Sequence, residues 1–473
     1  MSAHYDLAVI GAGPAGLAAA VLADELGLGV VLLDEQPSPG GQIYRAIEAS
    51  PLSGRGVLGS DYDAGRALVE RLRDSRVDYL EGAAVWQVAP GLEIGYTRGR
   101  SAALVKVPQV ILATGAMERP FPIPGWTLPG VMTAGAAQVL LKSAGLAASG
   151  AVFAGCGPLL YLAAWQYLRA GVPVTAVLDT TPWANYLRAA PRLPRALGAG
   201  RTLAKGLAMI AGLRRRGVRI VTGVGALRAV GAERLRAIAF KRLGRWQTVE
   251  TEVLFLHQGV VPDMNLAAAS GCAHDWSDAQ LCWRPRLDPW GGTTVAGIAV
   301  AGDGGGIGGA ASAALQGRLA ALGAADRLGR LDTSERERRA APIREALRRD
   351  QRVRPFLERL YRPARGFRVP EDDAVVVCRC EEVSLGDIRA ALATGCPGPN
   401  QLKSFLRCGM GPCQGRLCGL TVSEIIAAAR GLPVAEVGHF RPRPPVKPLR
   451  LDELAGLDEA DDGQPPRTAR VGS

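Results

Sequence analysis

Three glycines near the N-terminus restrict the fold of this chain more than any other feature of its sequence. Residues 6–10 read as a short apolar strand, and the run Gly11-Ala12-Gly13-Pro14-Ala15-Gly16 leads from it into an alanine-rich helix. Glycine at the first position permits a tight turn, at the second it lets the backbone approach a pyrophosphate, and at the third it lets helix and strand pack closely. The helix N-terminus offers free N–H groups and the positive end of a dipole to the phosphates. The pattern predicts a dinucleotide-binding β-α-β unit.

The acidic residue that such a unit needs follows at the end of the next strand. Residues 30–33 form the apolar run Val-Val-Leu-Leu, which ends at Asp34 and Glu35. An acid about 20 residues after the glycines is expected to hold the ribose hydroxyls of the nucleotide. Asp34, 18 residues after Gly16, is the first candidate for that role, and Glu35 is the second.

A second, altered copy of the pattern begins at residue 151. The strand 151–154 leads into Gly155-Cys156-Gly157, but Leu160 stands where the third glycine is expected, so helix and strand must separate slightly. Asp179 ends the next strand, where a ribose acid would favour NAD over NADP. Two interpretations remain: a domain that binds NAD or another adenine nucleotide, and a purely structural domain.

Three further motifs resemble those of flavoproteins with two dinucleotide-binding domains, a superfamily that includes thioredoxin reductase. They are Pro39-Gly40-Gly41-Gln42, Ala113-Thr114-Gly115 and Val300-Ala301-Gly302-Asp303. The resemblance implies FAD in the first unit, Asp303 on the ribityl chain, and a turn at 304–309 that brings a helix N-terminus to the pyrophosphate. The expected cofactor-binding residues are Gly11, Gly13, Pro14, Ala15, Gly16, Asp34, Glu35, Gly41, Gln42, Thr114, Gly115, Gly302 and Asp303.

The cysteines near the C-terminus form two tight pairs. Cys378 and Cys380 are one residue apart, and Cys408 and Cys413 flank the sequence Gly-Met-Gly-Pro. Paired thiolates joined by a helical segment suit an iron–sulfur cluster or a zinc ion. Zinc sites usually have about two to four residues between paired ligands, which is wider than Cys-x-Cys. We therefore favour a cluster over zinc and over a site without metal.

The cysteine segment resembles the 2Fe–2S domain of bacterioferritin-associated ferredoxin. That resemblance implies that Cys378, Cys380, Cys408 and Cys413 bind a 2Fe–2S cluster. The second pair is spaced more widely than in the small ferredoxins, so Cys418 and Cys396 are alternative ligands. Basic residues that are near in sequence could offset the negative charge of the cluster: Arg379, Lys403, Arg407 and Arg416.

Together the motifs predict an α/β flavoprotein with two dinucleotide-binding domains and a small helical 2Fe–2S domain at its C-terminus. The second unit would be a Rossmann-like domain inserted in the FAD domain. The expected boundaries are 1–117 and 253–330 for the FAD domain, 118–252 for the inserted NAD(P)-binding-like domain, 331–372 for a helical linker, 373–432 for the 2Fe–2S domain and 433–473 for an extended tail.

Neither a redox disulfide nor an acid–base pair can be assigned. The chain has no Cys-x-x-Cys, so disulfide reduction is not expected, and Cys156, Cys272 and Cys282 are interpreted as small buried residues. The four histidines lie outside any motif, and no pair of carboxylates stands out. The catalytic residues therefore stay unknown at this stage.

Composition and charge argue against a nucleic-acid or membrane-spanning protein. The net charge is +12 over 473 residues, but the only run of three arginines is Arg214–Arg216, so solvated helix faces and phosphate contacts are favoured over nucleic acid. The apolar stretch 143–168 is broken by Gly-Cys-Gly-Pro and predicts a strand, turn and helix, not a transmembrane segment. The odd number of cysteines, nine, and the lack of a secretory signal predict a reducing cytoplasm.

Nearly the whole chain resembles the large FAD/iron–sulfur subunits of heteromeric bacterial opine oxidases, hydrogen cyanide synthases and hydroxyproline dehydrogenases. The match rests on Pro-Gly-Gly-Gln-Ile-Tyr-Arg at 39–45, on the cysteine run 408–418 and on Arg-Pro-Pro-Val-Lys-Pro at 443–448, which is most similar to the opine oxidases. The resemblance implies that an amino-acid-oxidase-like partner oxidises the C–N bond of an opine or amino acid to an imine. It also implies a small ferredoxin-like subunit, a quinone-like electron acceptor, and a complex that is cytoplasmic or peripheral at the inner membrane through its partners.

Two other functions remain as alternatives. A stand-alone NAD(P)H-dependent reductase would need a working second nucleotide site and would deliver electrons through the cluster. A non-enzymatic redox or iron sensor would carry a bound flavin and could use the arginine-rich stretch 188–219 to bind nucleic acid.

Overall fold

A parallel five-stranded sheet forms the centre of the first half of the structure. The computed structural model describes residues 4–457, and its first sheet has the strand order β20-β7-β1-β2-β3. Leu7 in β1 pairs with Val30 in β2 on one side and with Gln109 in β7 on the other. The bounds are β1 Leu7–Ile10, β2 Val30–Asp34, β3 Asp78–Glu81, β7 Gln109–Leu112 and β20 Ile298–Val300.

The two faces of this sheet are covered by different structures, as the alternation of side chains along a strand requires. Leu7 and Val9 face the core beneath helices α1 (Pro14–Glu25) and α10 (Ala310–Arg327). Ala8 and Ile10 pack instead with an antiparallel meander. The meander consists of β4 Ala83–Ala89, β5 Glu93–Arg98 and β6 Ser101–Lys106. Short helices α2 (Ser60–Asp63) and α3 (Arg66–Arg73) complete this half.

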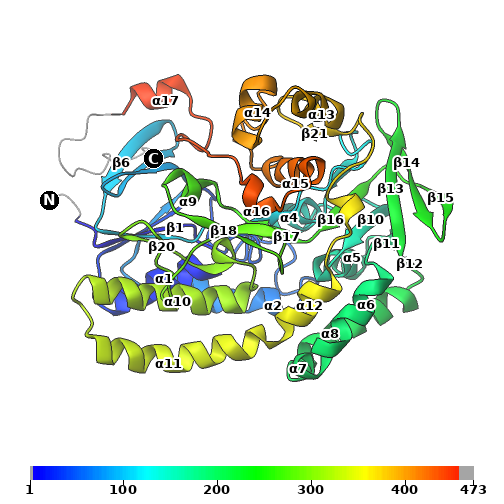
Figure 1. Cartoon of the computed structure of the whole chain (residues 1–473). Helices are drawn as coiled ribbons and strands as arrows, with labels where there is room; N and C mark the ends of the chain where they lie inside the picture. Colours follow the sequence, from blue (N-terminus) through cyan, green and yellow to red (C-terminus); the bar gives the residue numbers. More distant parts are fainter. Residues whose placement is uncertain (1–3, 458–473) are drawn as a thin grey trace, which may run out of the picture.

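A second parallel sheet, with strand order β12-β11-β10-β16-β9, lies beside the first (Figure 1). Helices α4 and α5 pack on one of its faces, and the antiparallel strands β13–β15 pack on the other. The bounds are β9 Val131–Thr133, α4 Ala134–Ala144, β10 Ala151–Cys156, α5 Pro158–Arg169, β11 Val174–Asp179, β12 Arg219–Thr222, β13 Val224–Gly231, β14 Leu235–Arg242, β15 Arg245–Glu250 and β16 Leu254–Gln258.

The predicted return to the first domain at residue 253 comes too early. Strand β16 pairs with β10 in the second sheet, and only the next strand, β17 (Val260–Pro262), pairs back with β8 (Ala116–Glu118). A short, fully buried strand has the same apolar sequence in either sheet, so the sequence could not assign it. The chain then continues through α9 Asn265–Ala269, β18 His274–Ser277 and β19 Cys282–Pro285.

The C-terminal part begins with the expected helical linker and ends in a small helical region with its own core. The linker contains α11 Thr333–Asp350 and α12 Arg354–Leu360. The cysteine region contains β21 Val376–Cys378, β22 Val383–Ser384, α13 Leu385–Ala393, α14 Pro399–Leu406 and α15 Gly419–Arg430. Figure 1 shows it against the upper side of the molecule, opposite α11.

The predicted extended tail is interrupted by two short helices, α16 (Val434–Val437) and α17 (Leu451–Ala455). Glu453 caps α17 by accepting the backbone N–H of Arg450 at 3.0 Å, a local bond that composition alone did not indicate. Between the helices the chain is extended, and the Val446 N–H donates to the Trp86 carbonyl at 2.9 Å. The remainder of the predicted tail, 458–473, lies outside the described residues.

The predicted fold class is confirmed: the chain is an α/β protein with two dinucleotide-binding-type sheets and a helical C-terminal region. Among residues 4–457, no helix combines the length and the apolar character that crossing a membrane requires.

The first glycine turn depends on contacts that leave no room for a side chain. A Cβ at Gly16 would overlap the Gly11 carbonyl oxygen, and a Cβ at Gly317 in α10 would overlap the Ala15 carbonyl oxygen of α1. Helix α1 can therefore pack against the turn after β1 only with glycine at position 16, and α10 can pack against α1 only with glycine at position 317.

Replacing Gly317 with alanine should lower the midpoint of thermal unfolding, because overpacking against backbone costs about 1–3 kcal/mol. Gly206→Ala is the matched control, since Gly206 also lies within a helix but has open space around it. In the control, the higher helix propensity of alanine should leave the midpoint unchanged or raise it. Equal midpoints for Gly317→Ala and the unmodified chain would contradict the close packing.

Candidate flavin and cysteine sites

The glycine turn and the Pro39–Gln42 motif lie against each other. The Gly40 N–H donates to the Ala12 carbonyl at 2.8 Å, and a Cβ at Gly41 would lie 2.7 Å from the Gly13 Cα. The two predicted motifs therefore form one surface of bare backbone at the N-terminus of α1. This is the surface that a pyrophosphate needs.

Asp34 and Glu35 have different environments. Asp34 is buried, and its carboxylate accepts the Ala12 N–H and, at 2.7 Å, the Gln36 N–H. Burial raises the pKa of Asp34, while those two hydrogen bonds oppose the rise. Glu35 is exposed and forms an ion pair with Lys447. Asp34 therefore holds the glycine turn in shape, and the second candidate, Glu35, is the more accessible acid.

Two basic residues near these acids were not predicted. Arg45 donates to the Gln36 side chain, and its charge, with that of Lys447, favours ionised Asp34. Lys447 is 412 positions away from Glu35 along the chain, so no local pattern could have placed it there. The predicted residue Gln42 contributes a backbone contact to this site: its carbonyl accepts a hydrogen bond from the Lys142 ammonium at 3.2 Å.

The remaining predicted flavin residues meet at the carboxyl ends of β7 and β20. One carboxylate oxygen of Asp303 accepts the N–H groups of Gly308 and Gly309 at 2.8 and 2.9 Å, directly before α10. Thr114 donates its hydroxyl to the Asp263 carbonyl at 3.2 Å, and Gly115 accepts the Asp263 N–H at 3.0 Å. A Cβ at Gly302 would lie 2.8 Å from the Ala15 Cβ, so this turn also lies against α1.

These residues fit FAD by the chemistry that they present. Bare glycine backbone at the N-terminus of α1 suits the pyrophosphate, and Glu35 suits a ribose diol. Asp303 lies in the turn before α10; we call the glycine turn, Gly41 and this second turn together the glycine cradle. They lie at the carboxyl ends of adjacent parallel strands, which is where open α/β sheets bind ligands.

The second glycine turn is covered by the linker. Asp179 is 1% exposed and accepts the Tyr161 hydroxyl at 2.5 Å. The Asn185 side chain donates to the carbonyls of Leu360 and Arg362, at 3.0 and 2.8 Å, which fixes the linker over this edge of the sheet. The acid that was expected to select NAD is therefore bonded within the protein.

An unpredicted acid–base pair lies beside the second turn. His257 Nδ1 is 2.6 Å from a Glu118 carboxylate oxygen, and His257 is buried. The other oxygen of Glu118 accepts the Gly135 N–H at 2.8 Å. This pair has the residue types of a general base, but its burial makes it a packing element.

Three of the cysteine thiols form a buried group. The sulfur atoms of Cys378, Cys408 and Cys418 all lie within 4.8 Å of one another. Hydrogen bonds from Cys408 and Cys418 lower the pKa of the Cys378 thiol to about 2. The group includes Cys418, which the sequence offered only as an alternative ligand.

The other two predicted ligands, Cys380 and Cys413, lie beside each other at the edge of that group. Each is partly exposed. Burial raises the pKa of the Cys380 thiol, and the neighbouring Cys413 thiol affects that pKa as well. Cys396, the second alternative, is buried elsewhere in the region, with its sulfur 3.6 Å from the Gly398 carbonyl. The chain thus brings five cysteines together, one more than the four thiolates of a 2Fe–2S cluster.

The basic residues near the cysteines have their own partners. Arg407 pairs with Glu381 at 3.0 Å, and Arg416 lies 3.8 Å from Asp263. Arg379 and Lys403 lie over the rings of Trp126 and Phe440. Their charges surround the cysteine region, although each is also used to hold it in place.

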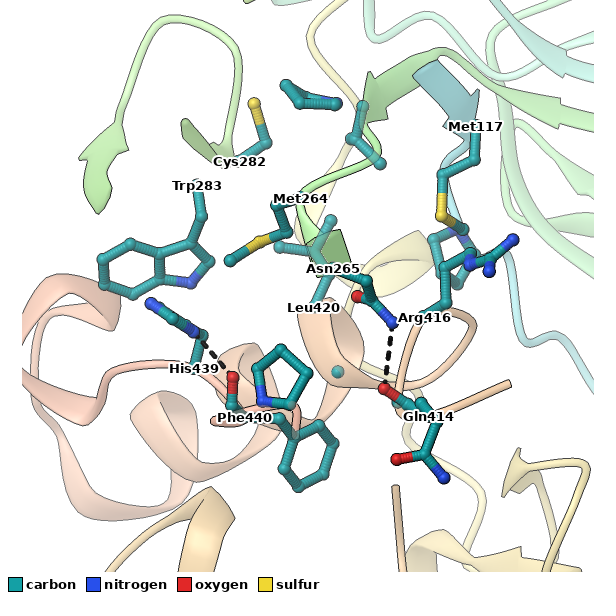
Figure 2. Close-up of a pocket in the computed structure, with 16 residues that line it drawn as sticks. Met117, Met264, Asn265, Cys282, Trp283, Gln414, Arg416, Leu420, His439 and Phe440 are labelled. Atoms are coloured by element: carbon teal, nitrogen blue, oxygen red, sulfur yellow. Dashed lines mark hydrogen bonds between the residues drawn. The ribbon is translucent and has the colours of Figure 1, made fainter. Parts of the chain in front are cut away.

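The cysteine loop contacts residues 263–265, the segment that bonds to Thr114 and Gly115 of the flavin motif. The Asn265 side chain donates to the Gln414 carbonyl at 3.1 Å, directly after Cys413 (Figure 2). A cavity of about 50 Å³ lies at this contact, lined by Met117, Met264, Trp283 and Phe440 among others. Its volume is far below the roughly 300 Å³ of a small-molecule site, so this contact leaves no room for an organic substrate.

A buried ion pair anchors the cysteine region to the linker. Arg368 pairs with Glu424 of α15, and both side chains are largely buried. The buried guanidinium of Arg119, next to β8, donates to the Gln280 carbonyl at 2.8 Å. Burial lowers the pKa of Arg119, and the charge of Glu424 opposes that shift.

Two known families match the chain. Residues 5–317 match the pyridine nucleotide-disulphide oxidoreductase family, and residues 375–457 match the sarcosine oxidase A3 domain. The A subunit of opine oxidase from Agrobacterium tumefaciens (strain Ach5) is 45% identical over 481 residues, which cover 100% of this chain and 94% of that protein. This chain belongs to the family of opine oxidase A subunits.

Two more distant similarities extend over almost all of the chain. Hydrogen cyanide synthase subunit HcnB of Pseudomonas protegens is 31% identical, over 95% of this chain and 97% of that protein. The crystal structure of L-proline dehydrogenase from P. horikoshii has the same fold, with a TM-score of 0.69 at 19% identity, over 95% of this chain and 79% of that chain. The family and the glycine cradle together establish a flavin-dependent oxidoreductase, with FAD as its cofactor.

We expect NADH and NADPH to leave the absorption of the bound flavin unchanged under anaerobic conditions. The physical reason is that Asp179 and the second glycine turn are covered by the linker. Stopped-flow absorption at the flavin band measures this directly, with dithionite as the positive control. Rapid bleaching by NADH would contradict the closed site and would favour the stand-alone reductase.

Proposed function

We propose that this member of the opine oxidase family is the FAD- and 2Fe–2S-containing electron-transfer subunit of a heteromeric dehydrogenase. The complex would oxidise the C–N bond of an opine or amino acid. An amino-acid-oxidase-like partner would carry out that oxidation, a small ferredoxin-like subunit would complete the assembly, and a quinone-like molecule would accept the electrons. Two relatives, from opine oxidase and from hydrogen cyanide synthase, are each named as one subunit of an enzyme, which supports assembly with other subunits.

The observation that carries the proposal is the connection that residues 263–265 make between the cysteine loop and the flavin motif at Gly115. Gly115 bonds to Asp263, and Asn265, two residues further, bonds to Gln414 next to Cys413. FAD, when bound, accepts two electrons together and a 2Fe–2S cluster accepts one at a time, so the two groups couple a two-electron donor to one-electron acceptors.

Residues of this chain would hold the two groups. Gly13 and Gly41 would admit the pyrophosphate of FAD, Glu35 would bind the ribose, and Asp303 shapes the turn before α10. We assign the cluster to Cys378, Cys380, Cys408 and Cys413. This set is supported by Cys378 and Cys408, which belong to the buried thiol group that also includes Cys418, and by Cys380, which lies beside Cys413. Cys418 is the alternative fourth ligand.

A partner that performs the oxidation is supported by the burial of the acid–base groups described in this chain. In the close histidine–carboxylate pair, His257 is buried and Glu118 is largely covered. The cavity between the flavin motifs and the cysteine loop is too small for an opine. We therefore propose that substrate binding and proton removal take place in the second subunit.

The cysteine assignment predicts a specific pattern of cluster loss. Cys378→Ser and Cys408→Ser should remove nearly all iron and acid-labile sulfide. Both thiols are ligands in the assigned set and also in the alternative set that contains Cys418. Cys413→Ser should do the same, whereas Cys418→Ser should retain the cluster. Iron and sulfide per chain and the visible spectrum measure the outcome, with the flavin content as an internal reference.

Cys396→Ser is the matched control for these variants, because Cys396 is buried in the same region but lies outside the thiol group. It should retain both the cluster and FAD. If Cys413→Ser keeps the cluster and Cys418→Ser loses it, Cys418 replaces Cys413 in the assignment. Zinc in place of iron in the unmodified chain would refute the cluster itself.

The division of labour predicts that the purified chain alone oxidises opines at least about a hundredfold more slowly than the complete complex. That factor is the usual contribution of a general base, which this proposal places in the partner. The assay is opine-dependent dye reduction by the chain before and after addition of the partner subunits. Full activity without partners would contradict the proposal.

A further inference from the structure

The helices that follow β11 carry charge of one sign. No aspartate or glutamate occurs between Asp179 and Glu233. Within this interval lie α6 (Trp183–Ala189), α7 (Leu193–Leu197) and α8 (Gly200–Arg215), which we call the basic helical unit. Its eight basic residues, counted through the residue after α8, are Arg188, Arg192, Arg195, Arg201, Lys205, Arg214, Arg215 and Arg216.

The basic helical unit also exposes large apolar side chains. Of the 17 large apolar side chains that are exposed among the described residues, six lie between 183 and 207. Leu187 is 80% exposed, Leu207 69%, Leu197 61% and Trp183 58%. Tyr186 and Leu193 complete the set, and the ring of Tyr186 lies 5.6 Å from that of Trp183. Such a concentration at the surface marks an interaction site.

The unit is attached to the body through few residues, and one of its basic side chains, Lys205, forms an ion pair with Asp61 of α2. Asn185 bonds to the linker carbonyls, Leu213 is buried, and Arg216 lies over the Trp165 ring of α5. The only buried residues in α6, α7, α8 and the turn between the first two are Asn185, Ala189, Ala196 and Leu213. Figure 1 shows the unit at the lower right edge of the molecule, away from the cysteine region.

The positive charge continues from α7 into a neighbouring cavity of about 670 Å³. Arg195 contributes to its wall, together with Arg284, Arg348, Arg352 and Arg354. Two acids line the same cavity, Glu345 and Glu358, and both are partnered: Glu345 pairs with Arg348 and Arg349, and Glu358 accepts the Gln280 amide. The surface beside α7 is therefore net positive as well.

We propose that the basic helical unit binds the surface of a membrane that contains anionic phospholipid. Exposed leucines with a tryptophan and a tyrosine enter the boundary between headgroups and acyl chains, and arginines contact the phosphates around them. No helix needs to span the bilayer for this mode of binding. The contact belongs to this chain itself, and it is independent of the electron-transfer role proposed above.

Charge and apolar exposure together favour lipid over other anionic partners. A nucleic acid would use the arginines but would leave the leucines of α6, α7 and α8 in water, because its backbone offers phosphates and no apolar phase. A protein partner would require matching acidic groups around an apolar centre. A bilayer with anionic headgroups satisfies both kinds of residue without any shape constraint.

Sedimentation of the full-length chain with lipid vesicles tests the proposal. The chain should bind vesicles that contain phosphatidylglycerol, and it should bind pure phosphatidylcholine vesicles at least about tenfold more weakly. Added salt should weaken binding to the anionic vesicles, because the charges are exposed. Leu187→Ser with Leu197→Ser, and separately Arg188→Glu with Arg201→Glu, should each weaken that binding about tenfold or more.

The matched control is Leu243→Ser, in the turn between β14 and β15, with Arg245→Glu at the start of β15; Leu243 is also 80% exposed. These control substitutions should leave vesicle binding unchanged. Equal binding to neutral vesicles, no binding to anionic vesicles, or equal binding by all variants would overturn the proposal. Loss of partner-subunit or DNA binding in the helical-unit variants, with vesicle binding intact, would overturn it too and would identify the other ligand.

Discussion

The contact between residues 263–265 and residues 413–416 is the interaction on which the proposed function depends. Asp263 is tied to Gly115 in the flavin motif, and Asn265 is tied to the carbonyl next to Cys413. The buried pair of Arg368 and Glu424 anchors the cysteine region to the linker as well. These bonds hold the cysteine region against the segment that is bonded to the flavin motif, as the proposed electron transfer requires.

The two β-α-β units differ in whether their nucleotide-binding turn is accessible. In the first, Gly13 faces Gly41 and the accessible acid is Glu35, so bare backbone and a carboxylate remain for a nucleotide. In the second, Asp179 is bonded to Tyr161 and covered by the linker that leads to the cysteines. The linker therefore covers the second nucleotide site, and the same linker leads to the cysteine region that packs beside the first site. This arrangement favours an electron donor in another subunit over NADH.

Much of the fold was predictable because it follows local rules. The glycine turn, the acid at the end of β2 and the strand before Asp303 each have a short sequence pattern with a physical cause. The thiol group was predictable only in part: spacing identified Cys378 and Cys408, but the position of Cys418 depends on how the loop 409–418 turns back. Lys447 beside Glu35, and the linker over Asp179, are contacts between distant segments that no local pattern encodes. The sequence placed the residues of β16 in the FAD domain, whereas β16 pairs with β10 of the second sheet, another contact that no local pattern encodes.

The most direct test of the account is an anaerobic reductive titration of the purified, cofactor-replete chain with dithionite, followed by absorption and electron paramagnetic resonance. An FAD and a 2Fe–2S cluster in one chain take up about three electron equivalents, two in the flavin and one in the cluster. We expect that total, with a reduced-cluster signal that integrates to about one spin per chain. Uptake of about two electrons, with no such signal, would show that the cysteines hold no redox cluster and would contradict the central claim.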